Sequence, residues 1–279
     1  MPAKIIDGKK ISQKLLENIK NRIKGLKEKP GLALVLVGNN PASEIYVNFK
    51  EKTCKEIGFY CERYNLPAGT NEEDLSKLVD DLNQKKEIHG ILVQLPLPKQ
   101  INENLIIDSI LPDKDVDGFT PVNLGNLVND NNMLEPATAR AVMALIESTG
   151  EKIEGKNAVV IGRSSIVGKP AALLLLQKNA TVTICHSKTK NLAEHTKNAD
   201  ILVVACGKAN LIKKDMVKKD AVVIDVGINR IGKKIVGDVD FENVKEVAGY
   251  ITPVPGGVGP MTIAMLLDNT LMAAKLSRR

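Results

Sequence analysis

Residues 157–178 decide the fold of this chain, and they read NAVVIGRSSIVGKPAALLLLQK. The apolar run at the start predicts a buried strand, Gly162 and Gly168 predict a tight turn, and the leucine-rich end predicts a helix. A glycine turn between a buried strand and a helix start directs backbone N–H groups at a pyrophosphate. The turn therefore indicates a dinucleotide site, although its spacing is not GxGxxG and the motif alone is a weak signal.

The same turn comes close to a phosphate-binding Walker loop, GxxxxGK[ST], but departs from it twice. Five residues instead of four separate Gly162 from Gly168, and Pro170 stands where a magnesium-binding hydroxyl is needed. The sequence therefore excludes ATP at this turn.

The end of the second predicted strand indicates which dinucleotide is preferred. An NAD site usually places Asp or Glu there to bind the ribose hydroxyls. This chain has Ser187 and Lys188 instead, and Arg163 lies in the glycine turn. A hydroxyl with cations favours the 2′-phosphate of NADP. The alternative is a polar strand end with a solvated lysine.

Strands and helices alternate on both sides of the turn, which is typical of parallel α/β units. Long apolar runs such as LALVLV predict strands buried on both faces. The expected strands are 32–37, 59–66, 90–95, 158–161, 181–185, 201–205 and 221–226, and the expected helices are 8–27, 43–57, 71–84, 138–149 and 261–275.

The pattern restarts after Pro136, which predicts an α/β fold of two domains. Residues 1–136 form the first, a parallel α/β domain, and residues 137–259 form the second, a Rossmann-like domain. The last helix, within 260–279, returns to complete the first domain. A cleft between the domains is the expected place for ligands.

Composition excludes several other classes of protein. No apolar run approaches the ~20 residues that span a bilayer, and the N-terminal residues lack the apolar core of a signal peptide. The net charge of +6 is spread over scattered lysines without aromatic interleaving, so no nucleic-acid partner is expected. The four cysteines form no CxxC pair and are expected to be reduced thiols of a cytoplasmic protein.

A second unusual loop, ITPVPGGVGPMT, occupies residues 251–262. Proline fixes φ and removes a donor, whereas glycine lets the backbone approach a flat partner closely. A rigid loop with few side chains before a helix start offers unpaired N–H groups to a ligand. The alternative is a helix-capping turn.

Three side chains stand out as candidates for chemistry. Tyr46 and Lys50 are four apart on an expected helix and so share a face, although a packing tyrosine and a solvated lysine would give the same pattern. Gln94 interrupts the apolar strand ILVQLPLP. A buried amide needs partners, and the carboxyl end of a parallel strand is where ligand sites lie.

The segment PDKDVDGF mimics the start of a calcium loop, with Asp113, Asp115 and Asp117 at alternate positions. The position that must supply a bidentate carboxylate is Leu124, so calcium is excluded. The carboxylates then either form and cap a turn or bind an amino-bearing ring. The histidines show no metal spacing, and no metal is expected.

Seven blocks together resemble the bacterial methylenetetrahydrofolate dehydrogenase/cyclohydrolase family over essentially the full chain. A further block, outside these seven, departs from the family pattern. Residues 137–141 read ATARA where the family has a proline- and glycine-containing run at a helix entry. That departure concerns local geometry. The matching blocks are 37–52, 90–98, 112–119, 159–170, 185–189, 222–230 and 251–262.

The resemblance implies a bifunctional enzyme of one-carbon metabolism, with an N-terminal folate-binding catalytic domain and a C-terminal NADP-binding domain. It oxidises 5,10-methylenetetrahydrofolate to the 5,10-methenyl cation with NADP, then hydrolyses this cation to 10-formyltetrahydrofolate. The implied catalytic residues are Lys50, Tyr46, Gln94 and Asp117. The implied substrate contacts are these four with Val93, Leu95, Pro255, Gly256, Gly257 and Gly259, and the implied NADP contacts are Gly162, Arg163, Ser164, Ser187 and Ile228.

The implied partners are tetrahydrofolate derivatives and a second copy of the chain in a homodimer, in a role that includes purine biosynthesis. Two alternatives remain open from the sequence. One is a dehydrogenase without the hydrolase step, against which Lys50 and Gln94 argue. The other is a regulatory NADP-binding module without catalysis.

Overall fold

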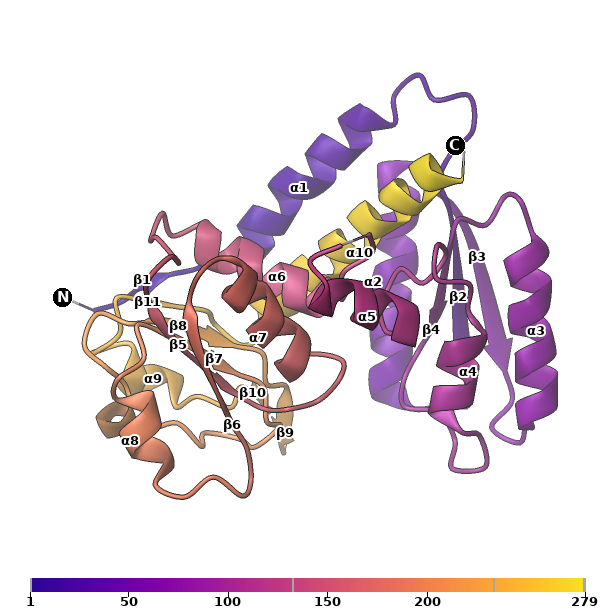
Figure 1. The fold of residues 1–279 in the computed structure, drawn as a ribbon. Coiled ribbons are helices and arrows are strands. Elements are labelled where there is room, and N and C mark those ends of the chain that lie inside the picture. Colours follow the sequence, from indigo (N-terminus) through magenta and orange to yellow (C-terminus); the bar gives the residue numbers. More distant parts are fainter. Residues whose placement is uncertain (1, 132, 233, 278–279) are drawn as a thin grey trace. The chain divides into compact units, whose positions relative to one another are not determined.

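The computed structural model describes residues 2–131, 133–232 and 234–277, and its chain divides into two compact units (Figure 1). The six-stranded unit comprises Met1–Gln13 and Thr138–Met265. The three-stranded unit comprises Lys14–Ala137 and Leu266–Arg279. Each unit is described separately.

The three-stranded unit is built on a parallel sheet in the order β3-β2-β4. Its strands are β2 (Gly31–Val37), β3 (Tyr60–Leu66) and β4 (Gly90–Val93). Every residue of the central strand β2 is buried, which explains its uninterrupted apolar sequence.

Helices cover this sheet on both faces. The helices are α2 (Pro41–Ile57), α3 (Glu72–Gln84), α4 (Glu103–Ser109) and α5 (Pro121–Val128). Leucine, isoleucine and valine side chains of α3 and α4 form one buried cluster with β2 and β4, and α2 contacts β2 and β3. Helix α2 begins where the Asn40 side chain accepts hydrogen bonds from the backbone of Ala42 and Ser43, and it ends at Gly58 with φ 92°.

The six-stranded unit has a wholly parallel sheet in the order β1-β11-β8-β7-β5-β6. Because β5 pairs with both β6 and β7, the chain reverses its winding direction between β5 and β7, where ligands of such sheets bind. The strands are β1 (Lys4–Ile5), β5 (Asn157–Ile161), β6 (Thr181–Cys185), β7 (Ile201–Val204), β8 (Val222–Asp225) and β11 (Tyr250–Ile251).

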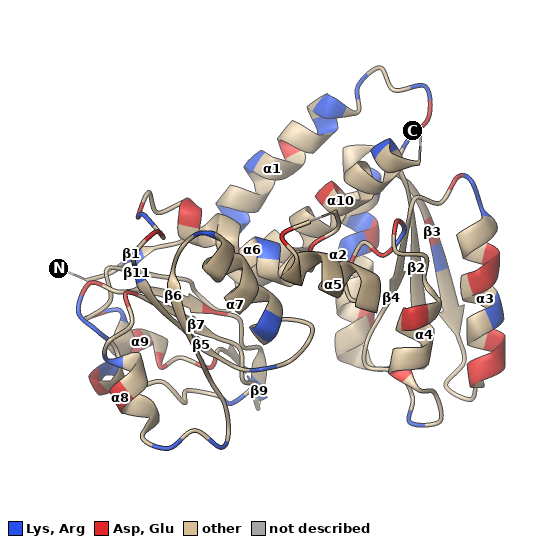
Figure 2. Ribbon diagram, in the orientation of Figure 1, with Lys and Arg blue, Asp and Glu red and all other residues tan. Residues whose placement is uncertain are grey.

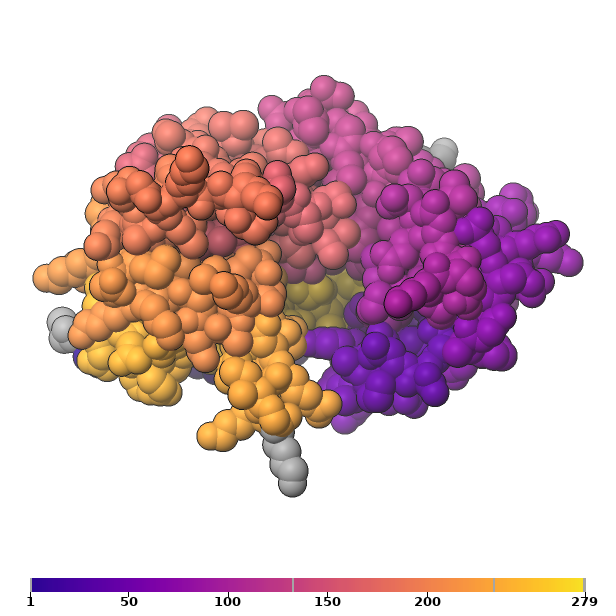
Figure 3. Space-filling model, turned by 90° about the horizontal axis from the view of Figure 1, so that it is seen from below, coloured from indigo at the N-terminus to yellow at the C-terminus, as the bar shows by residue number. Residues whose placement is uncertain are grey.

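Short helices and one hairpin complete this unit. The hairpin pairs β9 (Asn229–Ile231) with β10 (Lys234–Val236), and the segment containing it stands out from the surface of its unit in orange in Figure 3. The remaining elements are α6 (Ala137–Glu147), α7 (Gly168–Gln177), α8 (Leu192–Thr196), the 3-10 turn η1 (Lys214–Met216) and α9 (Phe241–Val244).

Three helices contain residues of both units: α1 (Gly8–Arg22), α10 (Val258–Leu276) and α6, whose first residue Ala137 belongs to the three-stranded unit. Within the three-stranded unit, Arg22 forms an ion pair with Asp268 at 2.9 Å. Figure 2 shows mainly basic charged positions along α1 and mainly acidic ones along α3, so charges of both signs are distributed over several helices. Within the described ranges, no helix is long and apolar enough to cross a membrane.

The predicted α/β fold is confirmed for both parallel sheets, with local differences that include the antiparallel β9–β10 hairpin. Residues 4–5 add a strand to the six-stranded sheet, whereas residues 1–136 were expected to form one domain. The first helix ends at Arg22 rather than at residue 27, and Gly25 follows with φ 84°. The ATARA departure still forms a helix, because Ala137, Ala139 and Ala141 are small enough to be buried at its start.

Candidate functional site

Lys50 lies on the buried face of α2 and is 9% exposed. The buried positions of this helix lie at the three- and four-residue spacing of one helix face and are Ser43, Val47, Lys50, Cys54 and Ile57. The sequence alternative of a solvated lysine is therefore wrong. A charged side chain is rarely buried without a partner.

Gln94 is the partner of Lys50 and follows β4 at the carboxyl edge of its sheet. Its backbone N–H donates to the carbonyl of Val35 at 2.8 Å, which continues the strand pairing by one residue. Its Oε1 accepts a hydrogen bond from Lys50 Nζ at 3.1 Å, and its Nε2 donates to the Leu95 carbonyl at 2.7 Å. The amide is thereby held with its oxygen toward the amine.

Asp117 lies in a turn that other residues fix. The buried carboxylate of Asp115 accepts hydrogen bonds from Gly118 N at 2.9 Å and from Thr120 N at 2.7 Å. From α10, Asn269 Nδ2 donates to the carbonyls of Val116 and Glu135, both at 2.8 Å. The turn-forming interpretation of Asp115 is thus confirmed, while Asp117 presents a half-buried carboxyl group.

The amine of Lys50 and the carboxyl of Asp117 shift each other's protonation. Burial lowers the pKa of Lys50, and the charge of Asp117 opposes that shift. Burial raises the pKa of Asp117 to about 6 from 3.8; Lys50 opposes this rise, and Asp115 adds to it. The site therefore contains an amine that loses its proton more easily, and a carboxyl that keeps its proton longer, than in water.

The remaining candidates of the three-stranded unit are near Lys50 or Gln94 in the sequence. Tyr46 is half-buried one helical turn before Lys50, and burial raises the pKa of its hydroxyl. Leu95 is half-buried. The side chain of Val93 belongs to the core cluster and is 6% exposed.

The glycine turn of the six-stranded unit lies at the switch point between β5 and β7. Gly162 has φ 133°, and a Cβ there would lie 2.2 Å from the carbonyl oxygen of Ala205, just after β7. A Cβ on Gly168 would lie 2.3 Å from the Gly162 carbonyl oxygen. Both positions require glycine because backbone occupies the space of a side chain.

The side chain of Ser164 closes the same turn, and the cationic side chain of Arg163 is exposed there. Ser164 Oγ accepts hydrogen bonds from Val167 N at 3.2 Å and Gly168 N at 3.3 Å, at the start of α7. Arg163 and Ser164 are exposed. An exposed cation beside the positive end of the helix dipole suits an anionic group of a dinucleotide.

Ser187 and Ile228 follow two other strands at this edge. Ile161 and Cys185 are partners at the ends of the adjacent strands β5 and β6. Arg163 and Ser187 each follow two residues later, so they occupy equivalent positions after these strands. Ser187 and Lys188 are exposed. Ile228, after β8, is 49% exposed and offers an apolar surface where most of the edge is polar.

The proline- and glycine-rich loop joins β11 to α10 within the six-stranded unit. Gly256 has φ 112°, and its carbonyl accepts a hydrogen bond from Lys9 N at 3.0 Å. Gly257 is buried, and a Cβ on Gly8 would lie 1.9 Å from the Gly257 carbonyl oxygen. Pro255 is exposed, and Gly259 is the second residue of α10.

The structure thus brings Tyr46, Lys50, Gln94 and Asp117 into one unit, and the glycine turn, Ser187, Ile228 and the 251–262 loop into the other. The supporting residues Asn269 and Asp225 were not predicted. Asp225 ends an apolar strand with a polar side chain, which is the signal that identified Gln94. Asn269 also interrupts an apolar run, IAMLLDNTLMAA, but the sequence does not indicate its contact with the Asp117 turn.

A doubly wound parallel sheet with a glycine turn at its switch point, joined to a second parallel α/β unit, defines a two-domain dinucleotide-binding protein. The chain belongs to the tetrahydrofolate dehydrogenase/cyclohydrolase family. Its residues 6–117 match the model of the family's catalytic domain, and residues 136–278 match that of its NAD(P)-binding domain. The family predicted from seven sequence blocks is confirmed.

Similar proteins span the whole chain. The bifunctional protein FolD of Moorella thermoacetica is 56% identical over 279 residues, which are 99% of this chain and all of that protein. The crystal structure of FolD from Campylobacter jejuni is 48% identical, covers 98% of this chain and 99% of its own, and has a TM-score of 0.96. A Trypanosoma brucei FolD complexed with NADP and an inhibitor is 38% identical, covers 100% and 99%, and has a TM-score of 0.97.

Proposed function

We propose that this chain is a bifunctional folate enzyme. It oxidises 5,10-methylenetetrahydrofolate to 5,10-methenyltetrahydrofolate with NADP, and it then hydrolyses this cation to 10-formyltetrahydrofolate. The full-length similarity to proteins named as bifunctional dehydrogenase/cyclohydrolases supports both activities. The unit with Lys50 is the folate-binding catalytic domain, and the six-stranded unit is the NADP-binding domain.

The observation that carries the proposal is the buried amine of Lys50. Hydration of the methenyl cation requires that a proton leave the attacking water and that a ring nitrogen be protonated as the ring opens. Lys50 can manage these protons because burial lowers its pKa, and a bound cation would lower it further. Gln94 holds the amine by a 3.1 Å hydrogen bond. This bond occupies one position on Lys50 Nζ and leaves the others available for substrate or water.

Other side chains of this unit bind and orient the substrate. Asp117 has a carboxyl group whose pKa, raised to about 6, leaves it mostly ionised at neutral pH, so it can accept hydrogen bonds from the amino-bearing pterin. Tyr46 offers a half-buried ring on the same helix face as Lys50. We assign further folate contacts to Val93, Leu95, Pro255, Gly256, Gly257 and Gly259; because the side chain of Val93 is buried, its contact is through the backbone.

The cofactor fits the glycine turn because Gly162 and Gly168 leave no room for side chains between β5 and β7. NADP supplies the hydride acceptor of the first step. We propose that Gly162 and Ser164 contact its pyrophosphate region. Ser187 with the cations Arg163 and Lys188 selects the 2′-phosphate, and Ile228 packs on its rings. No proton acceptor is needed for this step, because the folate nitrogen lone pairs stabilise the cation that forms.

We further propose that the protein acts in the cytoplasm as a homodimer and supplies one-carbon units for purine biosynthesis. Family resemblance supports the dimer. Sedimentation at working concentration is expected to give a particle of twice the chain mass, and a particle of 30.3 kDa would contradict the dimer.

One assay tests the proposed function. The purified protein is mixed with tetrahydrofolate, formaldehyde and NADP, and absorbance follows both NADPH and the methenyl chromophore. We expect NADPH to form and 10-formyltetrahydrofolate to accumulate faster than in a protein-free control. NADPH formation with only uncatalysed decay of the methenyl compound would leave a monofunctional dehydrogenase, and no NADPH would refute the proposal.

A further inference from the structure

Two buried aspartates lie at the carboxyl edge of the six-stranded sheet. Asp225 is the last residue of β8 and is 3% exposed, and Asp238 follows the β9–β10 hairpin and is 0% exposed. Neither carboxylate is accessible enough to bind a ligand directly. Each is instead surrounded by the loops that form this edge.

Asp225 joins two loops and the start of a third. Its Oδ1 accepts hydrogen bonds from Gly227 N at 3.0 Å and Asp238 N at 2.9 Å, and its Oδ2 accepts one from Val239 N at 2.9 Å. Its own N–H donates to the Thr252 hydroxyl at 2.8 Å, at the start of the proline- and glycine-rich loop. The loop that carries Ile228 is thereby tied to the segment after the hairpin.

Asp238 extends the same network to the switch point. Its Oδ2 accepts hydrogen bonds from Cys206 N at 2.8 Å and Gly207 N at 2.9 Å, and its Oδ1 accepts one from Asn229 Nδ2 at 2.8 Å. Cys206 follows Ala205, whose carbonyl packs against Gly162 of the cofactor turn. One network therefore includes the loops after β7 and β8, the hairpin and the start of the 251–262 loop.

Glycines make room for these carboxylates. A Cβ on Gly237 would lie 1.8 Å from Asp225 Oδ2, and a Cβ on Gly227 would lie 2.3 Å from Asp238 Oδ1. The carboxylates thus lie directly against glycine backbone, and their positions determine the path of both loops.

We infer that Asp225 and Asp238 are positioning residues of the cofactor edge, which fix the loops around the nucleotide without touching it. The inference rests on the proposed function, because it concerns how the chain binds NADP. It adds two residues that act through backbone hydrogen bonds rather than through ligand contact.

Asp225→Asn tests the inference because the amide has nearly the shape of the carboxylate. All three donors to Asp225 are backbone N–H groups, so either orientation of the amide places its NH₂ group against at least one of them. Burial and the charge of Asp238 raise the pKa of Asp225, so loss of the charge alone is not the costly part of this change. The effect measured therefore reports on the lost loop anchoring.

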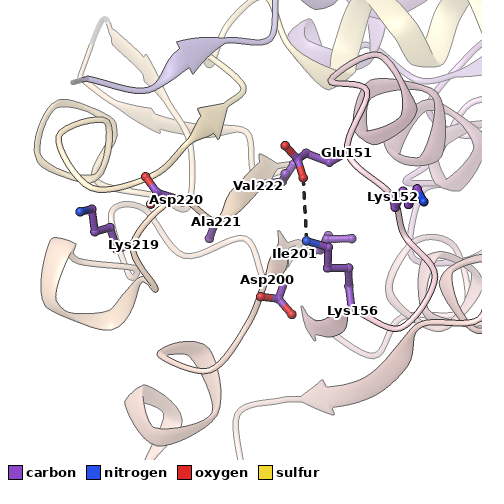
Figure 4. A pocket seen from close by; sticks show the side chains of 9 residues that line it. All are labelled: Glu151, Lys152, Lys156, Asp200, Ile201, Lys219, Asp220, Ala221 and Val222. Atoms are coloured by element: carbon purple, nitrogen blue, oxygen red, sulfur yellow. Dashed lines mark ion pairs between the residues drawn. The ribbon is translucent and has the colours of Figure 1, made fainter.

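The matched control is Asp200→Asn at the amino edge of the same sheet, among the residues of Figure 4. Asp200 also accepts a backbone hydrogen bond, from Asn157 N at 2.9 Å, and pairs with Lys218 at 2.7 Å. NADP affinity is measured directly by titration of the protein, and amide hydrogen exchange is measured at Gly207, Gly227 and Val239. We expect Asp225→Asn to weaken NADP binding by about tenfold or more and to speed exchange at these amides, while Asp200→Asn does neither.

Asn229→Ala serves as a milder second variant, since it removes one donor to Asp238 from a half-buried position. We expect an intermediate loss of NADP affinity. NADP binding within twofold of the parent in both Asp225→Asn and Asn229→Ala would overturn the inference. An unaltered protein that binds no NADP would refute the proposed function instead, and the exchange rates would still show whether the carboxylates anchor the loops.

Discussion

The Lys50 site of the three-stranded unit and the glycine turn of the six-stranded unit differ in which groups they present. The three-stranded unit presents side chains, with a buried amine held by an amide and a carboxyl group whose pKa is raised to about 6. The edge of the six-stranded unit presents backbone, with glycines where a Cβ would meet a carbonyl oxygen. Proton transfer needs a side chain with an adjusted pKa, whereas an extended anion is bound by N–H groups that no side chain obstructs.

This contrast predicts different responses to mutation. A change of functional group from amine to amide at Lys50 alters a reaction rate and leaves the fold intact, because glutamine keeps a long polar side chain that can hydrogen-bond Gln94. Addition of one methyl group at Gly162 displaces backbone and weakens cofactor binding. Four experiments test this distinction.

The largest expected effect is that of Lys50→Gln. Removing the amine should lower the rate of methenyl hydrolysis by roughly 10²–10⁴-fold, the usual contribution of general acid–base catalysis, while hydride transfer remains measurable. Accumulation of the methenyl chromophore in stopped assays is the expected signature.

Lys52→Gln is the matched control for Lys50, because Lys52 lies on the same helix with a side chain 71% exposed. It should hydrolyse the methenyl compound at the parent rate. Equal hydrolysis by Lys50→Gln and the parent would mean that another group activates the water.

The next effect is that of Gly162→Ala in the cofactor turn. The added Cβ would lie 2.2 Å from the Ala205 carbonyl at φ 133°, so the turn must move. We expect KM for NADP to rise by roughly 10- to 100-fold with a smaller change in kcat, since strain of about 1–3 kcal/mol is relieved by displacing the turn.

Gly155→Ala separates the clash from backbone strain. Gly155 also has a left-handed φ, 74°, but a Cβ there meets nothing within 4 Å. It should lower stability and leave KM for NADP unchanged. A similar KM in both variants would show that the close approach of Gly162 to Ala205 does not matter for binding.

A smaller effect is expected from Ser187→Asp. The new carboxylate repels the 2′-phosphate, so KM for NADP should rise about tenfold and KM for NAD should change little. Ser148→Asp, at an exposed position of the same unit, is the control. If the unaltered protein uses NAD as efficiently as NADP, in terms of kcat/KM, then Ser187 and its neighbours do not select the phosphate.

Local signals explain which parts of the fold could be predicted. The run 32–37 is apolar because both faces of β2 are buried, and Gln94 stands out because it interrupts such a run. The strand Lys4–Ile5 has only two residues, and its pairing with residues 250–251 leaves no periodic pattern in the sequence.

The supporting residues of the site were missed for the same reason. Asn269 holds the Asp117 turn across 153 positions of sequence, and nothing near Asn269 indicates that contact. Asp225 gave a local signal, because it ends an apolar strand. The sequence does not show that Gly237 makes room for its carboxylate, since that contact depends on the fold. Sequence thus identified groups that carry chemistry and missed those that position backbone.

The smallest effect concerns stability and tests whether Asp117 is held for chemistry at the expense of folding. Its pKa is raised from 3.8 to about 6, so between these values the folded chain binds more protons than the unfolded chain. The free energy of unfolding contributed by this group therefore falls as pH rises from about 4 to 6, and the penalty persists above that window. Asp117→Asn removes the penalty, and the variant should be more stable than the parent at pH 7.5 by on the order of 1–2 kcal/mol, a figure reduced for the partial exposure of the carboxyl. The difference should nearly vanish at pH 4.

Urea unfolding of the parent and Asp117→Asn at these two pH values measures this effect, with the exposed Asp113→Asn as control in the same turn. Lys50 loses a favourable charge in the variant, which limits the gain because the amine then gives up its proton more easily. The variant should nevertheless bind folate more weakly, because the same carboxyl group is the proposed pterin ligand. A gain in stability with a loss of folate affinity would show that burial of this side chain serves the site, as the side-chain character of this unit requires. A variant less stable than the parent at pH 7.5 would show instead that Asp117 stabilises the fold through Lys50.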